Sequence, residues 1–399
     1  MNKKIVKLMA ALFVCVTAVF HFGACKPQRV SIDGIVYEVA SGEACVVGYE
    51  GEITDAHIVE TCKGAPVVSI GERAFNNCNS LMSVIIPSSV TSIDDYAFAG
   101  CYNLTSLVIP EGVVSIGRWT FLGCSGLVNL VIPDSLTLVG HSAFHECSRL
   151  SYNVKDNLKY LGNEGNPYLY LAGYNSADLI DVSIDENCKF IADGAFANGI
   201  LTSVTIPDSV ISIGDSAFIY CGNLTNVVIG DGVTSIGNSA FKSCGELTSV
   251  VIPDSVTVIE PQAFSGCSSL TNVVIGNGVT LIESHAFEWC ESLTSVVIPD
   301  SVVQINDGAF WASGLESVVI GSGVRTIGGA AFNSNALTSV YYKGTAEEWL
   351  DVSMFAASNV GLTNATRYYY SENTPTVTGN YWHYDTDGIT PIVWKNTNE

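Results

Sequence analysis

The sequence predicts a β-rich repeat solenoid, with short strands on both sides of each coil, few short helical turns and a cap at each end. An Ala-Phe dipeptide recurs along most of the chain, mostly at intervals of 23 residues. Each interval carries an alternating, β-branched segment that Pro or Gly ends, which is typical of a short strand. One such unit cannot bury its own apolar side, so neighbouring units must stack into an array.

The phenylalanine of this dipeptide sets the register of the repeat, whose consensus is LTSVVIPDSVTSIGxxAFxxCxx. The first, fourth and sixth residues of LTSVVIP are apolar, and proline ends the strand because it lacks a backbone donor. Asp-Ser or Asp-Gly then forms a turn, VTSI forms a second short strand, and Ala-Phe fills the far side of the coil. About twelve coils, each about 4.8 Å deep, predict a rod or arc on the order of 60 Å long. The repeated residues are Phe75, Phe98, Phe121 (after Thr120), Phe144, Phe196, Phe218, Phe241, Phe264, Phe287, Phe310 and Phe332.

The residue that ends the first strand alternates between proline and glycine in the second half of the array. The alternating residues are Pro207, Gly230, Pro253, Gly276, Pro299 and Gly321. This pattern indicates that a unit of two coils was duplicated.

Eight of the thirteen cysteines occupy one position of the repeat, three residues after Phe in the wider loops. Since Cys is absent where this loop is one residue shorter, we expect it to point inward as a small buried apolar residue. With Cys15 and Cys25 in the N-terminal segment, an odd number remains, so a complete disulfide framework is impossible in an exported protein. The sequence leaves open whether Cys45, Cys62 and Cys188 form any disulfide. The repeated cysteines are Cys78, Cys101, Cys124, Cys147, Cys221, Cys244, Cys267 and Cys290.

Residues 1–24 are typical of a bacterial lipoprotein signal peptide and stand outside the fold. Three lysines precede an apolar run from Leu8 to Phe22, which is short for a membrane span. The run ends in Gly23-Ala24-Cys25, which resembles a lipobox, although Phe22 replaces the usual Leu. Cys25 is therefore the predicted lipidation site. Ordinary secretion and a retained membrane anchor are the alternatives.

The rest of the chain divides into three predicted parts. Residues 25–66 form an N-terminal linker and β cap, and residues 67–343 form the solenoid. A hairpin insertion near residues 157–177, with two aromatic-rich strands around the turn NEGNP, interrupts the array and is expected to protrude. One further coil is expected in the same 52-residue interval. Residues 344–399 form a C-terminal cap, in which Thr345 and Glu348 make a capping box that opens a short helix.

These motifs resemble the BspA-like family of leucine-rich repeats, which has 23-residue coils and an Ala-Phe-x-x-Cys signature. The resemblance covers about residues 67–343 and extends to the YLGNEGNPYLYL segment and to the C-terminal tail. It implies a leucine-rich-repeat solenoid and a surface or secreted protein of a bacterium. Adhesion to host matrix proteins or to other cells is implied as well, with no shared catalytic residues and no universal ligand motif.

Composition and motifs favour a protein without catalysis, cofactor or metal. The net charge is −22, and removal of residues 1–24 takes away three lysines and no acid, which leaves −25. This balance argues against a nucleic-acid partner and against electrostatic docking on anionic lipid, because both need clustered Lys and Arg. No nucleophile elbow, HExxH, P-loop or dinucleotide fingerprint is present.

Three segments contain metal-ligand residue types, and each has a simpler interpretation. His141, His145 and Cys147 stand close in sequence, but two His four apart share a face only on a helix. Asp385-Thr-Asp387-Gly388 lacks the remaining ligands of a calcium loop and is better explained as a hairpin turn. An acidic row in successive turns offers oxygen ligands for Ca²⁺, although Asp is also the favoured turn residue. The row comprises Glu111, Asp134, Asp208, Asp231, Asp254, Asn277 and Asp300.

Candidate ligand-binding residues are the aromatic side chains that break the repeat, because interface affinity concentrates in such anchors. The alternative is that they pack on neighbouring coils. The outward strand face carries Ser or Asn and then Val, which suits an extended partner or a solvated sheet. The candidates are Tyr160, Tyr168 and Tyr170 of the insertion and Trp119, Tyr220, Trp289 and Trp311 of the loops, with Tyr96 and Tyr102 nearby.

The sequence therefore predicts a cell-surface binding or adhesion module that presents a repeat scaffold to an extracellular protein or glycan. Membrane attachment through the N-terminal lipid places it in the bacterial cell envelope. The alternative is a non-catalytic structural or spacer lipoprotein of the envelope, which uses the solenoid only as a rigid arm.

Overall fold

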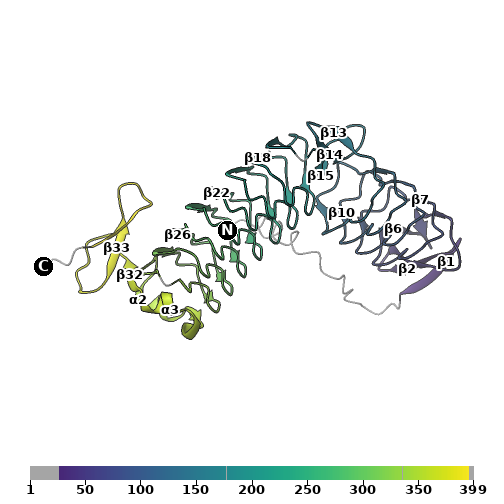
Figure 1. The fold of residues 1–399 in the computed structure, drawn as a ribbon. Helices are drawn as coiled ribbons and strands as arrows, with labels where there is room; N and C mark the ends of the chain where they lie inside the picture. The colour runs from purple at the N-terminus through teal and green to yellow at the C-terminus, as the bar shows by residue number, and fades with distance from the viewer. Residues whose placement is uncertain (1–26, 177, 335, 395–399) are drawn as a thin grey trace.

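The computed structural model describes residues 27–176, 178–334 and 336–394. The chain winds as a solenoid whose coils stack in an open arc between an N-terminal and a C-terminal cap (Figure 1). Each regular coil contributes one strand to each of two parallel layers, and the helices within the described ranges are short and lie at the C-terminal end. The predicted β-rich solenoid is thus confirmed. Among the described residues, no helix is long and apolar enough to cross a bilayer.

The first layer contains the longer strands, which correspond to the SVVI part of the repeat. Neighbouring strands pair in parallel without register shift, so that Val250 lies beside Val273. The buried and exposed residues alternate, as the period-2 pattern predicts. These strands are β7 (Ser83–Ile85), β9 (Ser106–Val108), β11 (Asn129–Val131), β16 (Asp181–Ser183), β18 (Ser203–Ile206), β20 (Asn226–Ile229), β22 (Ser249–Ile252), β24 (Asn272–Ile275), β26 (Ser295–Ile298), β28 (Ser317–Ile320) and β30 (Ser339–Tyr342).

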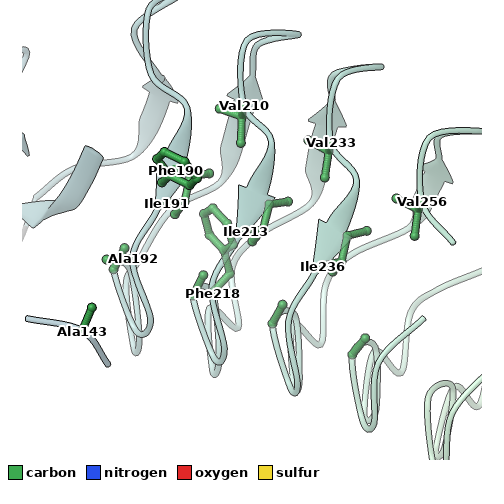
Figure 2. Close-up of a cluster of buried hydrophobic side chains, with 14 of the residues drawn as sticks. Ala143, Phe190, Ile191, Ala192, Val210, Ile213, Phe218, Val233, Ile236 and Val256 are labelled. Carbon is green, nitrogen blue, oxygen red and sulfur yellow. The ribbon is translucent and has the colours of Figure 1, made fainter. Parts of the chain in front are cut away.

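The second layer contains two-residue strands from the VTSI part of the repeat. They also pair in parallel, so Ile213 lies beside Ile236, and most coils turn an isoleucine of this strand inward. Figure 2 shows this inner side, where Ile191, Ile213 and Ile236 face the buried Phe218 across the coil. The strands are β8 (Ser92–Ile93), β10 (Ser115–Ile116), β12 (Leu138–Val139), β17 (Phe190–Ile191), β19 (Ser212–Ile213), β21 (Ser235–Ile236), β23 (Val258–Ile259), β25 (Leu281–Ile282), β27 (Gln304–Ile305), β29 (Thr326–Ile327) and β31 (Ser353–Met354).

The Ala-Phe turns close the third side of each coil and stack on one another. The backbone N–H of Phe218 donates to the carbonyl of Ala240 at 2.7 Å, and Phe241 repeats this contact with Ala263 at 2.8 Å. The phenylalanine rings form a parallel stack with centroids about 5 Å apart, for example 4.9 Å between Phe218 and Phe241. Because backbone and rings share one spacing, the turn satisfies its polar groups and fills the core at the same time.

The repeated cysteines point inward, as predicted, and all eight are buried. Seven of them donate the thiol hydrogen to the carbonyl of the phenylalanine one coil earlier, at 3.1–3.3 Å. The structure also leaves Cys45, Cys62 and Cys188 as free thiols.

The two ends of the array are closed by elements that depart from the repeat. At the N-terminal end, three antiparallel strands pair with the second layer through β6, while β4 starts the first layer. At the other end, Thr345 and Glu348 form the predicted capping box of α2. Trp382 is fully buried there and donates its indole N–H to the carbonyl of Tyr342 at 2.9 Å. The terminal elements are β1 (Gln28–Ile32), β2 (Ile35–Ala40), β3 (Glu43–Tyr49), β4 (Asp55–His57), β5 (Thr61–Cys62), β6 (Ala65–Ile70), α2 (Ala346–Leu350), η1 (Ala356–Ser358), α3 (Val360–Asn364), β32 (Thr366–Tyr370), β33 (Tyr381–Tyr384) and β34 (Pro391–Val393).

The insertion does not protrude as expected but supplies a rung of the stack. It forms β13 (Asn153–Lys155), β14 (Leu158–Leu161) and β15 (Tyr170–Tyr174) as an antiparallel meander. Gly162 bridges to Val131 of the first layer, and β15 pairs in parallel with β17 of the second. The insertion is thus the hidden coil that the 52-residue interval predicted. Tyr170 meets the ring of Phe144 and Tyr174 stacks on Phe196, so these two tyrosines continue the phenylalanine stack through the insertion.

Candidate functional site

Tyr160 and Tyr170 are core residues, so the packing alternative holds for these two candidate anchors. Tyr160 is 1% exposed and its hydroxyl accepts the backbone N–H of Asp185 at 3.3 Å. Tyr170 is 7% exposed and meets the ring of Phe144 edge-on at 5.2 Å. Tyr168 is half-buried and packs against Tyr160. Tyr160 and Tyr170 cannot touch a ligand while the coil is folded, so these two leave the set of candidate anchors.

The loop aromatics divide into a packed group and an exposed group. Trp119 is half-buried between the ring of Tyr96, stacked at 5.1 Å, and the edge of His141, at 5.2 Å. The guanidinium of Arg73 continues this row over Tyr96. Trp119 therefore packs on the neighbouring coils instead of standing free as an anchor.

Trp289 and Trp311 lie side by side on adjacent coils and remain open to solvent. They are 46% and 36% exposed, and their rings meet edge-on at 5.4 Å. Trp311 also lines a hollow of about 340 Å³ with small neighbours such as Ala312 and Ser334. Tyr220, which is 53% exposed, occupies the repeat position of Trp289 in the coil three repeats earlier.

The outward face of the first layer carries a row of exposed valines. Val228, Val251 and Val274 are 49%, 57% and 47% exposed and occupy one position in successive strands. The row ends before Val319, which is buried. This surface is apolar at its centre and hydroxyl-rich beside it, as the repeat pattern predicts.

The acidic row in the turns has a structural role that sequence did not reveal. The carboxylate of Asp208 accepts the backbone N–H of Asp231 at 2.8 Å, and Asp254 accepts that of Asn277 at 2.6 Å. Asp300 accepts the N–H of Ser322 at 2.9 Å and pairs with Lys343. These carboxylates therefore bind the next coil. At the C-terminal hairpin, Asp387 likewise accepts two backbone N–H groups of its own turn, as predicted.

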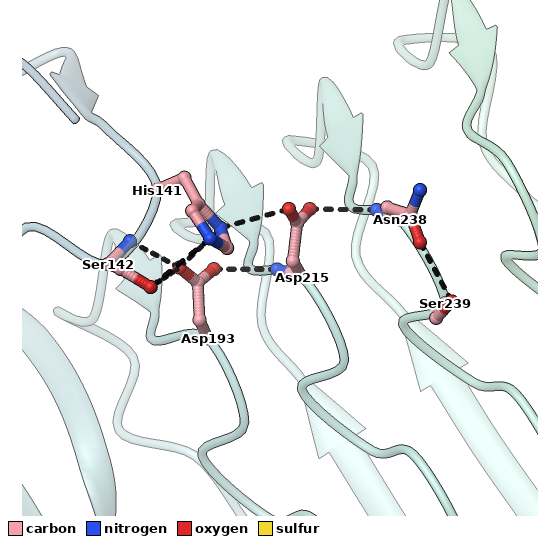
Figure 3. A network of polar contacts seen from close by, with 6 residues as sticks. All are labelled: His141, Ser142, Asp193, Asp215, Asn238 and Ser239. Atoms are coloured by element: carbon pink, nitrogen blue, oxygen red, sulfur yellow. Dashed lines mark hydrogen bonds and ion pairs between the residues drawn. The ribbon is translucent and has the colours of Figure 1, made fainter. Parts of the chain in front are cut away.

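A polar cluster that sequence reasoning missed joins His141 to Asp193 and Asp215 (Figure 3). The Nδ1 atom of His141 lies 2.9 Å from Oδ2 of Asp193 and 3.0 Å from Oδ2 of Asp215. Burial raises the pKa of the Asp215 carboxyl, and the Asp193 carboxylate raises it further. Neither His145 nor Cys147 belongs to this cluster, because Cys147 is buried in the thiol row and His145 points to solvent. Each of the three residues stands three positions before the repeated Phe. The sequence does not show that His141 and Asp193 are neighbours, because they are 52 positions apart.

The cluster lies where the inserted rung lacks an Ala-Phe turn of its own. In regular coils the N–H of the second residue before Phe donates to the next coil's backbone, as Trp119 does to the carbonyl of His141 at 2.9 Å. At Ser142 the carboxylate of Asp193 takes the place of that carbonyl. The missing turn leaves a notch of about 300 Å³ whose walls include Phe144, Tyr170 and Asp193.

The predicted signal peptide, residues 1–24, and the predicted lipidation site Cys25 lie outside the described residues.

A known family model agrees with this architecture. The family model described as "BspA type Leucine rich repeat region" matches in six copies, over residues 58–166, 172–282 and 234–360. No curated protein matches. A leucine-rich repeat protein from Bacteroides ovatus is similar at 23% identity and a TM-score of 0.41, covering 88% of this chain and 100% of its own. A leucine rich cell surface protein from Faecalibacterium prausnitzii shares 24% identity at a TM-score of 0.34, over 83% of this chain and 99% of its own. Since the repeat model covers more than half of the sequence and the coils have its periodicity, the chain belongs to the BspA-type leucine-rich-repeat family.

Proposed function

We propose that this protein is a cell-surface binding module, which presents its solenoid to an extracellular protein or glycan and has no catalytic role. The observation that carries the proposal is the exposed pair Trp289 and Trp311 beside an open hollow. Membership in a family of repeat scaffolds supports it, because such scaffolds keep their coils while their surface residues change.

The tryptophan pair has the properties of a binding anchor. Tryptophan is enriched among the residues that dominate interface energies, and a neighbouring hollow lets a partner's side chain complete the contact. Trp289 has a positive φ of 57°, which is uncommon for a large side chain. That backbone conformation occurs at the same place in other coils, where Ser243 and Gly266 fill it. The scaffold thus provides a position that projects outward, and here it carries an indole.

The row of valines offers a second contact area for the same partner. Its exposed side chains form an apolar strip along the first layer, flanked by Ser, Thr and Asn. An extended chain or a flat surface can follow such a strip, while the tryptophans supply specificity. The strongly acidic sequence argues against nucleic acid as the partner.

The surface location is inferred from the N-terminal segment. A basic start, a short apolar run and Gly23-Ala24-Cys25 favour export followed by lipid attachment at Cys25. An N-terminal lipid would hold the solenoid on the bacterial cell envelope with its coils available to partners.

The proposal is tested by binding to purified host matrix proteins and to a glycan array. We expect the double substitution Trp289→Ala and Trp311→Ala to weaken binding by at least about tenfold, because anchor residues contribute 2 kcal/mol or more. Tyr102→Ala is the matched control, since Tyr102 is 51% exposed at the other end of the solenoid. Circular dichroism verifies that both variants keep the fold. Unchanged binding by the folded double variant would contradict the proposed anchor.

The second candidate function is a spacer that holds another molecule away from the envelope. The burial of Tyr160 and Tyr170 favours it, because the segment that interrupts the repeat is used for packing rather than display. Absence of binding across both panels would favour the spacer.

A further inference from the structure

The His141 cluster brings one residue from before the inserted rung into contact with two from beyond it. Each of the three is the second residue after a two-residue strand, namely β12, β17 and β19. In a regular array the side chains at this position lie one above another, and each belongs to the coil next to the previous one. Here the inserted rung lacks its turn, so His141 reaches Asp193 and Asp215 directly (Figure 3).

Nδ1 of the imidazole has no aligned hydrogen bond, although a carboxylate oxygen of Asp193 and one of Asp215 lie within 3.0 Å of it. Nε2 of His141 lies 3.2 Å from the hydroxyl of Ser142, which in turn lies 3.4 Å from the carboxylate of Asp193. A chain from Nε2–H through the hydroxyl to Asp193 satisfies both donors and places the lone pair on Nδ1. Nδ1 is shielded from solvent, and neither nearby carboxylate oxygen is aligned with it for a hydrogen bond.

The two carboxylates are held in place from behind. Oδ1 of Asp193 accepts the backbone N–H of Asp215 at 2.6 Å, and Oδ1 of Asp215 accepts that of Asn238 at 2.8 Å. Each carboxylate therefore turns its other oxygen, Oδ2, toward the imidazole. Partners of this kind orient the ligands of metal sites and fix the direction of their lone pairs.

We propose that His141 Nδ1, Asp193 Oδ2 and Asp215 Oδ2 bind one divalent transition-metal ion of the zinc class. Ligand atoms about 2.1 Å from one ion lie about 3.0–3.4 Å from one another at tetrahedral or right angles. The two observed contacts to Nδ1, 2.9 and 3.0 Å, are close to that range. Imidazole with carboxylates suits zinc and its neighbours, whereas calcium takes oxygen ligands alone. A metal ion at these three residues would be contrary to the sequence, which predicts no metal site.

The position of the site gives the ion a role in the fold. It joins the turn before the inserted rung to the two turns after it, where the backbone ladder is interrupted. Three protein ligands leave a further coordination position for water, and the three side chains are 22–37% exposed, so the ion can exchange with solvent. Metal binding is therefore expected to stabilise the folded protein, because the three ligands converge only there.

The experiment is zinc titration of the purified, chelator-treated protein by calorimetry, with cobalt absorption as the spectroscopic probe of nitrogen and oxygen ligands. We expect one ion per chain. His141→Ala and Asp215→Asn should each weaken binding at least about tenfold, and zinc should raise the melting temperature of the wild type but not of these variants. His145→Ala is the control, since His145 stands four residues away in the same turn, is 62% exposed and lies outside the cluster.

Asp215→Asn keeps an acceptor for the backbone of Asn238, so it decides the question if His141→Ala fails to fold. The proposal is overturned if the wild type binds no zinc, in which case a protonated imidazole occupies the cluster. It is also overturned if the folded His141 and Asp215 variants bind zinc as the wild type does.

Discussion

The thiol of Cys244 donates to the carbonyl oxygen of Phe218 at 3.2 Å, one coil earlier in the stack. The same carbonyl accepts the backbone N–H of Cys221 within its own coil. Repetition of this pair explains why Cys appears only in the wider loops, where the chain reaches inward far enough to place a small donor. The cysteines are therefore part of the hydrogen-bond system of the core.

We expect the repeated cysteines to be free thiols that react only on unfolding. Burial raises the pKa of Cys101 to about 12 and of Cys221 to about 11, so little thiolate forms at neutral pH. Alkylation without reductant, before and after unfolding, counts them by mass. Fewer than about four new labels on unfolding would show an oxidised or accessible row.

Phe241→Ala is expected to destabilise the protein by about 3–5 kcal/mol, the usual cost of removing a fully buried phenylalanine. Its ring stacks on Phe218 at 4.9 Å and on Phe264 at 5.3 Å, so both contacts are lost. Phe355→Ala is the control, since Phe355 is 73% exposed. Denaturant unfolding measures the difference, and equal stability of the two variants would refute the role of the stack.

Gly232→Ala is expected to destabilise the coil by about 1–3 kcal/mol, as overpacking does. A Cβ at this position would lie 1.8 Å from the carbonyl oxygen of Asp208, so the two coils must separate. Gly222→Ala is the matched control, because a Cβ there meets nothing within 4 Å. A melting temperature for Gly232→Ala as high as that of the control would contradict the prediction.

The pair of Lys155 and Asp185 is expected to make stability depend on acid pH. Burial alone would raise the pKa of Asp185, but hydrogen bonds from Lys155 and Asn187 outweigh it and hold the pKa below 3.8. A carboxylate whose pKa is lowered by folding stabilises the fold fully when the pH is above the ordinary pKa of the group. This stabilisation is lost as pH falls through the folded-state pKa. The melting temperatures of wild type and Asp185→Asn should therefore differ most near neutral pH and converge only as pH falls below the folded-state pKa of Asp185, which is lower than 3.8. A difference that is independent of pH would count against the pair.

Cys25 is expected to carry the lipid. Expression of the full gene in a bacterium should give a membrane-associated protein, and intact mass should show a lipid on residue 25. Cys25→Ala should lose both the lipid and the membrane association. A Cys25→Ala protein that still fractionates with membranes would reject this anchor.

The sequence determined the coil and its period. An apolar pattern of period two, the Ala-Phe dipeptide and the inward cysteine all arise within one repeat, where neighbours along the chain are neighbours in space. The capping box at Thr345 and the hairpin at Asp387 are equally local and were predicted for the same reason. The sequence also indicated the extra coil, because the interval between Phe144 and Phe196 is too long for one repeat.

Only the tertiary structure decided what lies between coils. A Cβ on Gly230 would lie 2.5 Å from the carbonyl carbon of Pro207, so contact between these two coils restricts the residue at this position, which the repeat pattern alone does not show. Tyr160 and Tyr170 were candidate anchors in the sequence and proved to be core. His141 contacts Asp193 because the inserted rung between them lacks an Ala-Phe turn. The two residues are 52 positions apart, so only the path of the inserted rung brings them together. Local pattern fixes which way a side chain points along its own strand, whereas the stacking of neighbouring coils fixes what it meets.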